Sequence, residues 1–240
     1  MKNTLWTFGC SFTDEYSPIN TNPPNNYDLY AELRGGSLPT IWAKQLADKF
    51  KLNYKNKGCG AKSNYTIFYT FCDWCAQFKK GDIVIVQWTT IYRFLFANDE
   101  NFLHDILPSA NYTNYNMKTI EDILVNRTNS IWIEELIKFT KIINELCKEK
   151  ELNIFYWSYS DKEYIKYIKN NFKEFDDTTW ITESKGDDKI NGLLDIITEK
   201  TNNNHTIELE TKGKVLDKHL GELGHNFQAN YFYNYIKKQI

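Results

Sequence analysis

The sequence contains no long apolar run, and no window approaches the 18 consecutive apolar residues that a membrane-spanning helix needs. The first residues, Met1 to Gly9, also lack the extended apolar stretch and the small-residue cleavage site of a secretory signal peptide. These two absences argue against membrane insertion and against conventional secretion. We therefore expect a cytoplasmic protein with no membrane partner.

The chain has no basic excess either, because 29 Lys and Arg stand against 31 Asp and Glu. The net charge is −2 and the pI is near 6.1. A nucleic-acid-binding domain of this size usually shows a basic stripe, whereas the basic residues here are scattered. No nucleic-acid partner is expected.

Cysteine is scarce and odd in number, with five residues in 240. An odd count fits a reducing compartment better than a disulfide framework. Cys72 and Cys75 form one CxxC pair, and no second pair follows at zinc spacing. We interpret this pair as structural rather than metal-binding or redox-active, and we expect no metal and no cofactor.

The length suits a single domain spanning residues 1–240. Four consecutive β-branched residues, Ile83 to Val86, indicate a strand covered on both faces, as in a parallel sheet. Further strands alternate with helices along the chain, which predicts an α/β protein: a three-layer α/β/α sandwich around a mostly parallel sheet. The other predicted strands are 5–8, 52–56 and 153–157, and the predicted helices are 39–50, 63–78, 130–150, 161–172 and 222–238.

Three segments interrupt this alternation. Residues 14–38, rich in Asn, Pro and Gly, predict a long loop. Residues 94–129 are aromatic and Asn-rich with little periodicity, and we expect an insertion or lid over the carboxyl edge of the sheet. The polar segment near the C-terminus predicts a short strand at 178–181 and a helix at 189–201.

The first candidate site segment is Phe8 to Thr13, with the sequence FGCSFT. It puts Ser11 on a tight turn after a buried strand, where ligand sites of open α/β sheets form. Backbone N–H groups at such a turn suit the oxyanion of acyl transfer, although strand-Gly-x-Ser also occurs in nucleotide-binding turns. Cys10 faces away from Ser11 on an extended backbone, so we expect it to be buried and not to be the nucleophile.

Two later segments carry further candidates. Asn56 to Asn64 contains Gly58 and Gly60, whose bare backbone lets a ligand approach closely, and the amide of Asn64 is a potential donor. The alternative is an ordinary strand-to-helix turn with Ser63 as the helix cap.

The last candidate segment lies before the final predicted helix, where Asp217 and His219 stand close together. Imidazole is the side chain best suited to accept a hydroxyl proton near neutral pH. A single histidine before a helix is usually structural. The second histidine, His225, is expected to pack or to cap the last helix.

Together these segments resemble the SGNH/GDSL hydrolase family. Phe8 to Thr13 is similar to its first block, in which phage-like members carry GCSFT, and Asn56 to Gly60 is similar to its second. His219-Leu220 followed by Gly224 is similar to the fifth block. Five of the eleven glycines fall within these segments, in the family's order. The resemblance implies the SGNH fold with its flavodoxin-like sheet.

The resemblance also implies a serine hydrolase of the esterase or O-deacylase type, acting on a small acyl ester through an acyl-serine intermediate. Ser11 would be the nucleophile, and His219 the base and then the acid. The backbone N–H groups of Ser11 and Gly60 would form the oxyanion hole. The expected partner is a small-molecule or glycan ester substrate.

Two departures from the family pattern leave an alternative open. The third-block Asn is absent from Gln87 to Arg93 (QWTTIYR), so Asn64, Thr89 or Gln87 is the candidate replacement donor. The family's triad Asp, three residues before the His, is Leu216 here, and Asp217 is the candidate to orient the imidazole. A catalytically weak binding module that uses the same crevice and the 94–129 insertion is therefore the alternative function.

Thr89 and Arg93 are the candidate substrate-binding residues. The guanidinium of Arg93, just past the third strand, suits a substrate carboxylate or phosphate. It is equally suited to a structural ion pair with Asp14, Glu15 or Asp99. A nucleotide-binding function is disfavoured, because neither a Walker-type Lys-Ser/Thr pair nor GxGxxG follows the first strand.

Overall fold

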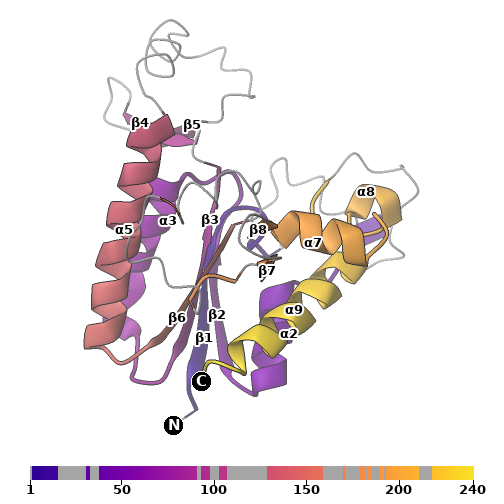
Figure 1. Cartoon of the computed structure of the whole chain (residues 1–240), viewed down its shortest axis with the longest axis horizontal. Coiled ribbons are helices and arrows are strands. Elements are labelled where there is room, and N and C mark those ends of the chain that lie inside the picture. The colour runs from indigo at the N-terminus through magenta and orange to yellow at the C-terminus, as the bar shows by residue number, and fades with distance from the viewer. Residues whose placement is uncertain are drawn as a thin grey trace, which may run out of the picture.

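The computed structural model of the protein is a layered α/β fold built on one central sheet (Figure 1). The sheet has four parallel strands in the order β2-β1-β3-β6. These strands are β1 (Thr4–Gly9), β2 (Asn53–Gly58), β3 (Ile83–Trp88) and β6 (Asn153–Ser158). The structure describes residues 2–15, 31–32, 38–90, 93–97, 103–106, 129–158, 170, 179–181, 183–184, 190–191, 193–210 and 218–240.

The burial of each strand follows its place in the sheet. All six residues of β3 are buried, as expected for a strand between neighbours and under helices on both faces. In contrast, β2 lies at the edge of the sheet and alternates between exposed and partly buried residues. At the opposite edge, Trp180 forms a parallel bridge with Tyr156 of β6 and extends the sheet beyond its fourth strand.

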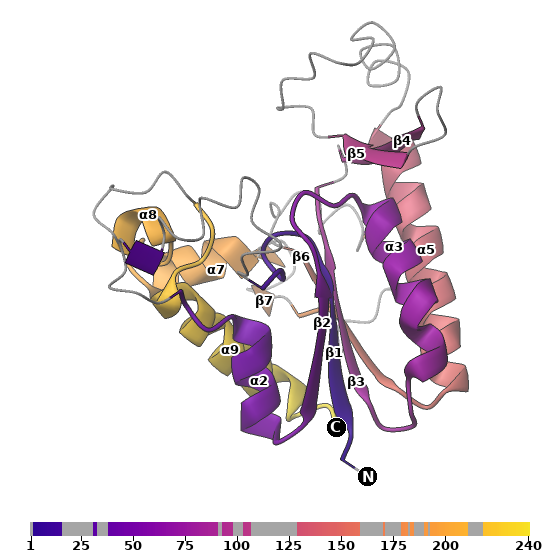
Figure 2. The same ribbon diagram turned by 180° about the vertical axis from the view of Figure 1, so that it is seen from behind.

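Helices cover both faces of the sheet (Figures 1 and 2). On one face lie α3 (Asn64–Trp74), the short 3-10 helix η1 (Cys75–Gln77) and α5 (Asn129–Glu149). On the other face lie α2 (Trp42–Phe50) and α9 (Glu222–Ile236). The chain thus forms the three-layer α/β/α sandwich that the alternation of strands and helices predicted.

Each helical layer has its own aromatic core. Between α3 and α5 the rings of Phe68 and Phe139 stack with centroids 4.4 Å apart. On the other side, Trp42 of α2 packs edge-on against Phe232 of α9 and Trp157 of β6, at 4.9 and 5.7 Å. Such ring pairs hold the helices on the sheet by apolar burial and by their preferred edge-to-face geometry.

The smaller elements lie outside the central sheet. β4 (Phe94–Ala97) and β5 (Leu103–Ile106) form an antiparallel pair near the start of α5, and β7 (Glu183–Ser184) pairs with β8 (Ile190–Asn191). Two helices, α7 (Leu193–Lys200) and α8 (Ile207–Glu210), precede α9. Among the residues described, no helix has both the length and the apolar character to cross a membrane.

The long elements agree with the sequence prediction, and several boundaries correct it. The helix predicted at 189–201 is wrong at its start, because residues 190–191 pair as β8 and α7 begins at Leu193. The helix expected from residue 130 begins at Asn129, and the β4–β5 pair was not predicted. The predictions for most of 161–172, most of 14–38 and most of the insertion at 94–129 fall outside the described residues.

The CxxC pair lies in the core between α3 and α5, beside Cys147. Cys72, Cys75 and Cys147 are all free thiols, and burial raises the pKa of Cys147 to about 12. Burial also raises the pKa of Cys72. Over the described ranges, no group of three or more His, Cys, Asp or Glu side chains is arranged to hold a metal ion. Cys72 and Cys75 are partly buried and pack against the hydrophobic core on this face of the sheet.

Candidate active site

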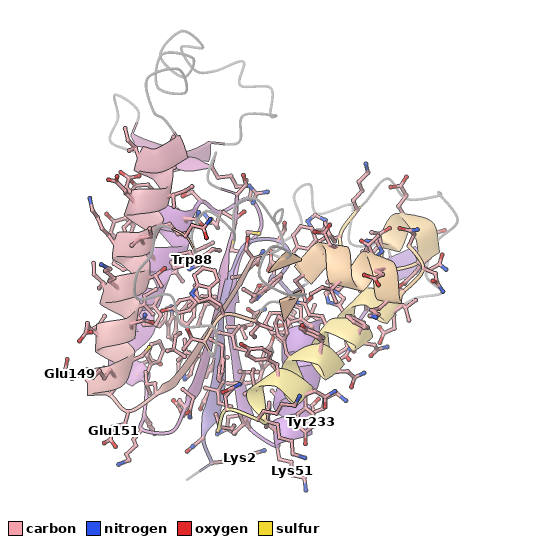
Figure 3. All side chains as sticks on the ribbon, in the orientation of Figure 1. Lys2, Lys51, Trp88, Glu149, Glu151 and Tyr233 are labelled. Carbon is pink, nitrogen blue, oxygen red and sulfur yellow. The ribbon has the colours of Figure 1, made fainter. Side chains whose placement is uncertain are left out.

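The site lies at the carboxyl edge of the sheet, the end at which the neighbouring strands β1 and β2 finish. Gly9 is the register partner of Gly58, and the N–H of Cys59 donates to the Gly9 carbonyl at 3.0 Å. This is the upper edge of the sheet in Figure 1. At the opposite end of the sheet, where the strands begin, lie the charged side chains of Lys2, Lys51 and Glu151 (Figure 3).

Ser11 stands on a tight turn that directly follows β1. The backbone N–H groups of Thr13 and Asp14 both donate to the Cys10 carbonyl, at 2.9 and 3.0 Å. Cys10 is fully buried, whereas Ser11 is partly exposed. The turn therefore presents the serine and hides the cysteine, as the alternation along an extended backbone predicted.

The buried side chain of Gln87, on β3, holds this turn. Its Oε1 accepts from the Cys10 backbone N–H at 3.2 Å and from the Thr13 hydroxyl at 2.6 Å, and its Nε2 donates to Cys10 Sγ at 3.0 Å. A Cβ on Gly9 would lie 2.5 Å from Gln87 Oε1, so only glycine leaves room for this anchor. The geometry makes Gln87 a support of this turn, residues 10–14, which is called the nucleophile turn after its candidate nucleophile Ser11.

Replacing Gln87 by Leu is expected to destabilise the fold by about 2–4 kcal/mol, because several hydrogen bonds are lost and a buried N–H is left unpaired. The rate of labelling at Ser11 by a serine-reactive probe should fall with it. Thermal unfolding and probe labelling measure the two effects. Gln45→Ala, which removes one exposed contact to the Thr40 carbonyl, is the control. Wild-type stability in Gln87→Leu would contradict the anchoring role.

Asn56 ties the turn to β2. Its Nδ2 donates to the Thr13 carbonyl at 2.7 Å, and its Oδ1 accepts from the Thr7 hydroxyl and the Gly58 N–H, each at 2.9 Å. A Cβ on Gly58 would lie 2.6 Å from the carbonyl carbon of Thr13. The asparagine and the glycine together bring the β2 turn against the nucleophile turn.

Gly60 lies next to Ser11 on that second turn. A Cβ built on Gly60 would be 4.0 Å from Ser11 Cβ and 3.5 Å from Asp14 Oδ2. The Gly60 N–H donates to that carboxylate oxygen at 2.8 Å. The following residue, Ala61, has a φ of 65°, which is uncommon for a residue with a Cβ and marks the tightness of this turn.

Asn64 and Thr89 bind each other at the end of β3. The Asn64 amide donates to the Thr89 carbonyl at 3.1 Å and accepts from its N–H at 2.8 Å, so it closes the carboxyl end of the strand. Ser63 caps α3 by accepting from the Thr66 N–H at 3.3 Å, which was the alternative interpretation of this segment. The Thr89 hydroxyl is buried and has no hydrogen-bond partner in the described part of the chain.

Arg93 follows β3 after a short turn, in which its N–H donates to the Thr90 carbonyl at 3.3 Å. Its Nε and Nη1 are buried, and neither has a hydrogen-bond partner within the described ranges. Of the acids proposed as structural partners, Asp99 lies outside the described residues. A guanidinium in this position suits either an anionic ligand or an ion pair with a carboxylate, the two roles that the sequence indicated.

His219 lies on the segment that enters α9, against the nucleophile turn. Its ring packs on the ring of Phe12, the residue after Ser11, with centroids 5.0 Å apart. Its carbonyl accepts from the Ile207 N–H at 2.9 Å. Residues 11 and 219, far apart in the sequence, are thus brought to the same edge of the sheet.

The start of α9 is capped from α8. The Glu210 carboxylate accepts from the N–H groups of Glu222 and Leu223, at 3.0 and 2.9 Å. A carboxylate at a helix N-terminus pairs unsatisfied donors and complements the helix dipole. A Cβ on Gly221 would overlap this carboxylate, so a side chain there would displace the Glu210 cap. This cap determines where the His219 segment meets the helix.

His225 is buried in the first turn of α9 and serves α2. Its Nδ1 accepts from the Trp42 N–H at 3.2 Å, at a helix start where Ile41 offers no side-chain cap. Trp42 Nε1 in turn donates to the Phe12 carbonyl at 2.9 Å. His225 therefore connects α9, α2 and the nucleophile turn, and it caps α2 rather than the last helix.

The predicted site residues are only partly brought together. Ser11, Gly60 and the His219 segment share one edge of the sheet, whereas Asp217 lies outside the described residues. The contact of the His219 ring with Phe12, the neighbour of Ser11, is what places His219 at this edge.

Sequence reasoning missed the roles of Asp14 and Glu210. Asp14 follows the Ser11 turn directly, and a carboxylate three residues after a proposed nucleophile was the available signal. Glu210 offered none, because its partners belong to a helix that begins twelve residues later. Both carboxylates accept from backbone N–H groups, and the residue types in a sequence do not show which backbone N–H a carboxylate will bind.

The fold and site define a layered α/β protein with a serine turn and a glycine turn at the carboxyl edge of a parallel sheet, in agreement with the predicted three-layer α/β/α architecture. Among solved structures, the chain is similar to protein YxiM from Bacillus subtilis, with a TM-score of 0.50 and 13% identity. The match covers 100% of this chain, which spans 57% of the length of that protein.

A second similar structure is a putative lipolytic protein of the G-D-S-L family from Desulfitobacterium hafniense DCB-2. It has a TM-score of 0.44 and 13% identity, over 97% of this chain and 99% of that one. No family model matches the sequence, and no curated protein matches it. At these identities the comparisons concern the fold alone.

Proposed function

We propose that the protein is a serine hydrolase that cleaves a small acyl ester. One observation carries the proposal: the turn after β1 presents Ser11 beside the backbone of Gly60, and His219 packs on the adjacent Phe12. A nucleophile, a backbone donor and an imidazole at one edge are the parts that acyl transfer needs. The resemblance of the three sequence segments to SGNH hydrolases supports the same assignment.

The reaction proceeds in two halves. Ser11 Oγ attacks the ester carbonyl while its proton passes to His219, and the proton then goes to the departing alcohol oxygen. The tetrahedral oxyanion is held by the N–H groups of Ser11 and Gly60. Water hydrolyses the acyl-serine by the same sequence in reverse, releasing the acid and restoring the serine. In this proposal Asp217 orients the imidazole.

Two further groups are assigned to substrate binding. The Thr89 hydroxyl and the Nε and Nη1 atoms of Arg93 are buried and have no hydrogen-bond partner in the described part of the chain. We assign Arg93 to an anionic group of the substrate, and O-acylated glycans remain among the candidate substrates. Asn64, paired with the Thr89 backbone, keeps one amide hydrogen for the oxyanion.

A serine-reactive fluorophosphonate is expected to label the wild-type protein at Ser11, because an activated serine attacks such a probe at phosphorus. The labelled peptide is identified by mass spectrometry, and p-nitrophenyl acetate hydrolysis is followed in parallel. Ser11→Ala should abolish labelling, whereas Cys10→Ala is the control that should retain it. Labelling that persists in Ser11→Ala would refute Ser11 as the nucleophile.

A catalytically weak binding module is the second candidate function. It is favoured by one observation: the Gly60 N–H, a donor that the oxyanion needs, already donates to Asp14. A wild-type protein that neither reacts with the probe nor turns over an activated ester, even after Asp14 is replaced, would favour this alternative.

A further inference from the structure

The carboxylate of Asp14 occupies the position where an oxyanion would bind Gly60. Its Oδ2 is 2.8 Å from the Gly60 nitrogen, and a Cβ on Gly60 would touch both this oxygen and the Cβ of Ser11. Ser11, the Asp14 carboxylate and the Gly60 N–H therefore lie next to one another. A hydrogen bond to an ionised acceptor is also stronger than one to a neutral carbonyl.

The nucleophile turn holds Asp14 in this position. The backbone N–H of Asp14 donates to the Cys10 carbonyl at 3.0 Å, in the same turn that carries Ser11. The carbonyl of the preceding Thr13 is held by Asn56 at 2.7 Å. The backbone that presents the serine therefore also directs the carboxylate to Gly60.

We propose that Asp14 is an internal competitor for the Gly60 N–H and restrains the hydrolase that we propose above. The N–H can donate either to the carboxylate or to the tetrahedral oxyanion. Two negative charges close to one N–H also repel each other. Substrate must therefore displace the carboxylate. A rotation of the Asp14 side chain to another rotamer frees the N–H and leaves the turn unchanged.

Removing the carboxylate is expected to increase activity, which a purely structural role cannot do. Asp14→Ala should raise kcat/KM for p-nitrophenyl acetate at least about tenfold, toward the 10²–10³-fold that one oxyanion donor supplies. Asp14→Asn keeps the shape but not the charge, and should give a smaller gain. Asp14→Ala activity equal to or below that of wild type, in a folded protein, would overturn the proposal.

Glu15→Gln is the matched control. Glu15 is the next residue and an exposed carboxylate, and both acids act on Tyr54 of β2, whose pKa is raised by burial and by the charges of Glu15 and Asp14. The Gly60 N–H donates to Asp14 and not to Glu15. Activity within about twofold of wild type is expected. A gain in Glu15→Gln equal to that of Asp14→Ala would assign the effect to general charge and overturn the proposal.

The Gly60 amide proton gives a readout that does not depend on activity. In ¹H–¹⁵N spectra it should lie downfield in the wild type and move upfield in Asp14→Ala, with faster hydrogen exchange. An unchanged Gly60 signal refutes the contact itself. If the signal moves but neither protein labels or hydrolyses, the proposed hydrolase function fails. If wild type reacts and Asp14→Ala gains nothing, only the competition proposal fails.

Discussion

Ser11→Ala, His219→Ala and the double variant are expected to lose the same activity, roughly 10³- to 10⁶-fold in kcat. A general base has no function when there is no hydroxyl for it to deprotonate, so the second substitution adds nothing to the first. The wild type, the two single variants and the double variant form a double-mutant cycle, which is measured by initial rates of p-nitrophenyl acetate hydrolysis. The remaining rate would come from binding and from backbone donors at Gly60.

Lys218→Ala is the control for this cycle, because Lys218 is exposed and immediately precedes His219. Near wild-type activity is expected in that variant. A double variant that loses the product of the two single effects would mean that the two side chains act independently. In that case Ser11 and His219 would not be a nucleophile and its base.

Asp82→Ala is expected to cost about 3–5 kcal/mol of unfolding free energy, the largest loss of stability that we anticipate. The Asp82 carboxylate is 1% exposed and accepts three hydrogen bonds. Its Oδ1 binds the Thr4 N–H at 2.8 Å, and its Oδ2 binds Trp6 Nε1 and the Lys79 N–H at 3.0 Å each. Alanine leaves these donors without their acceptor.

The physical reason for this cost is that Asp82 joins the start of β1 to the turn before β3. These two strands form the middle of the sheet, so the loss affects the packing of both faces. Thermal unfolding should show a midpoint lower by about 6–20 °C for a chain of this size. Asp48→Ala, which removes an exposed ion pair with Lys44, is the control and should change stability by less than about 1 kcal/mol. Equal effects of the two substitutions would contradict the role of Asp82.

The strands and long helices could be predicted because their patterns are local. The run from Ile83 to Val86 has an apolar side chain at every position, which suits only a strand covered on both faces, and β3 is such a strand. The helices α2 and α5 were predicted from their apolar spacing to within a few residues. The two-residue strands β7 and β8 were not, because so short a pairing has no periodicity to detect.

In the candidate site, too, the features that depend on neighbouring residues were predicted, and those that depend on distant residues were not. The turn that exposes Ser11 and buries Cys10 follows from a glycine at a strand end and from the alternation of an extended backbone. Gln87 and Asn64 were considered as oxyanion donors. In the structure the Gln87 amide binds Cys10 and Thr13, and the Asn64 amide pairs with the Thr89 backbone and keeps one hydrogen. The role of an amide side chain depends on the backbone groups it faces, and for Gln87 those lie 77 residues earlier in the chain.

The sequence by itself determined the order of strands and helices, the tight turn that exposes Ser11, and the position of a histidine before the last helix. These features depend on the conformational preferences of neighbouring residues. Only the tertiary structure decided that Phe12 meets His219, that Glu210 caps the helix after it, and that Asp14 binds the Gly60 N–H. Each of these contacts joins groups that are separated along the chain and become neighbours only when the chain is folded.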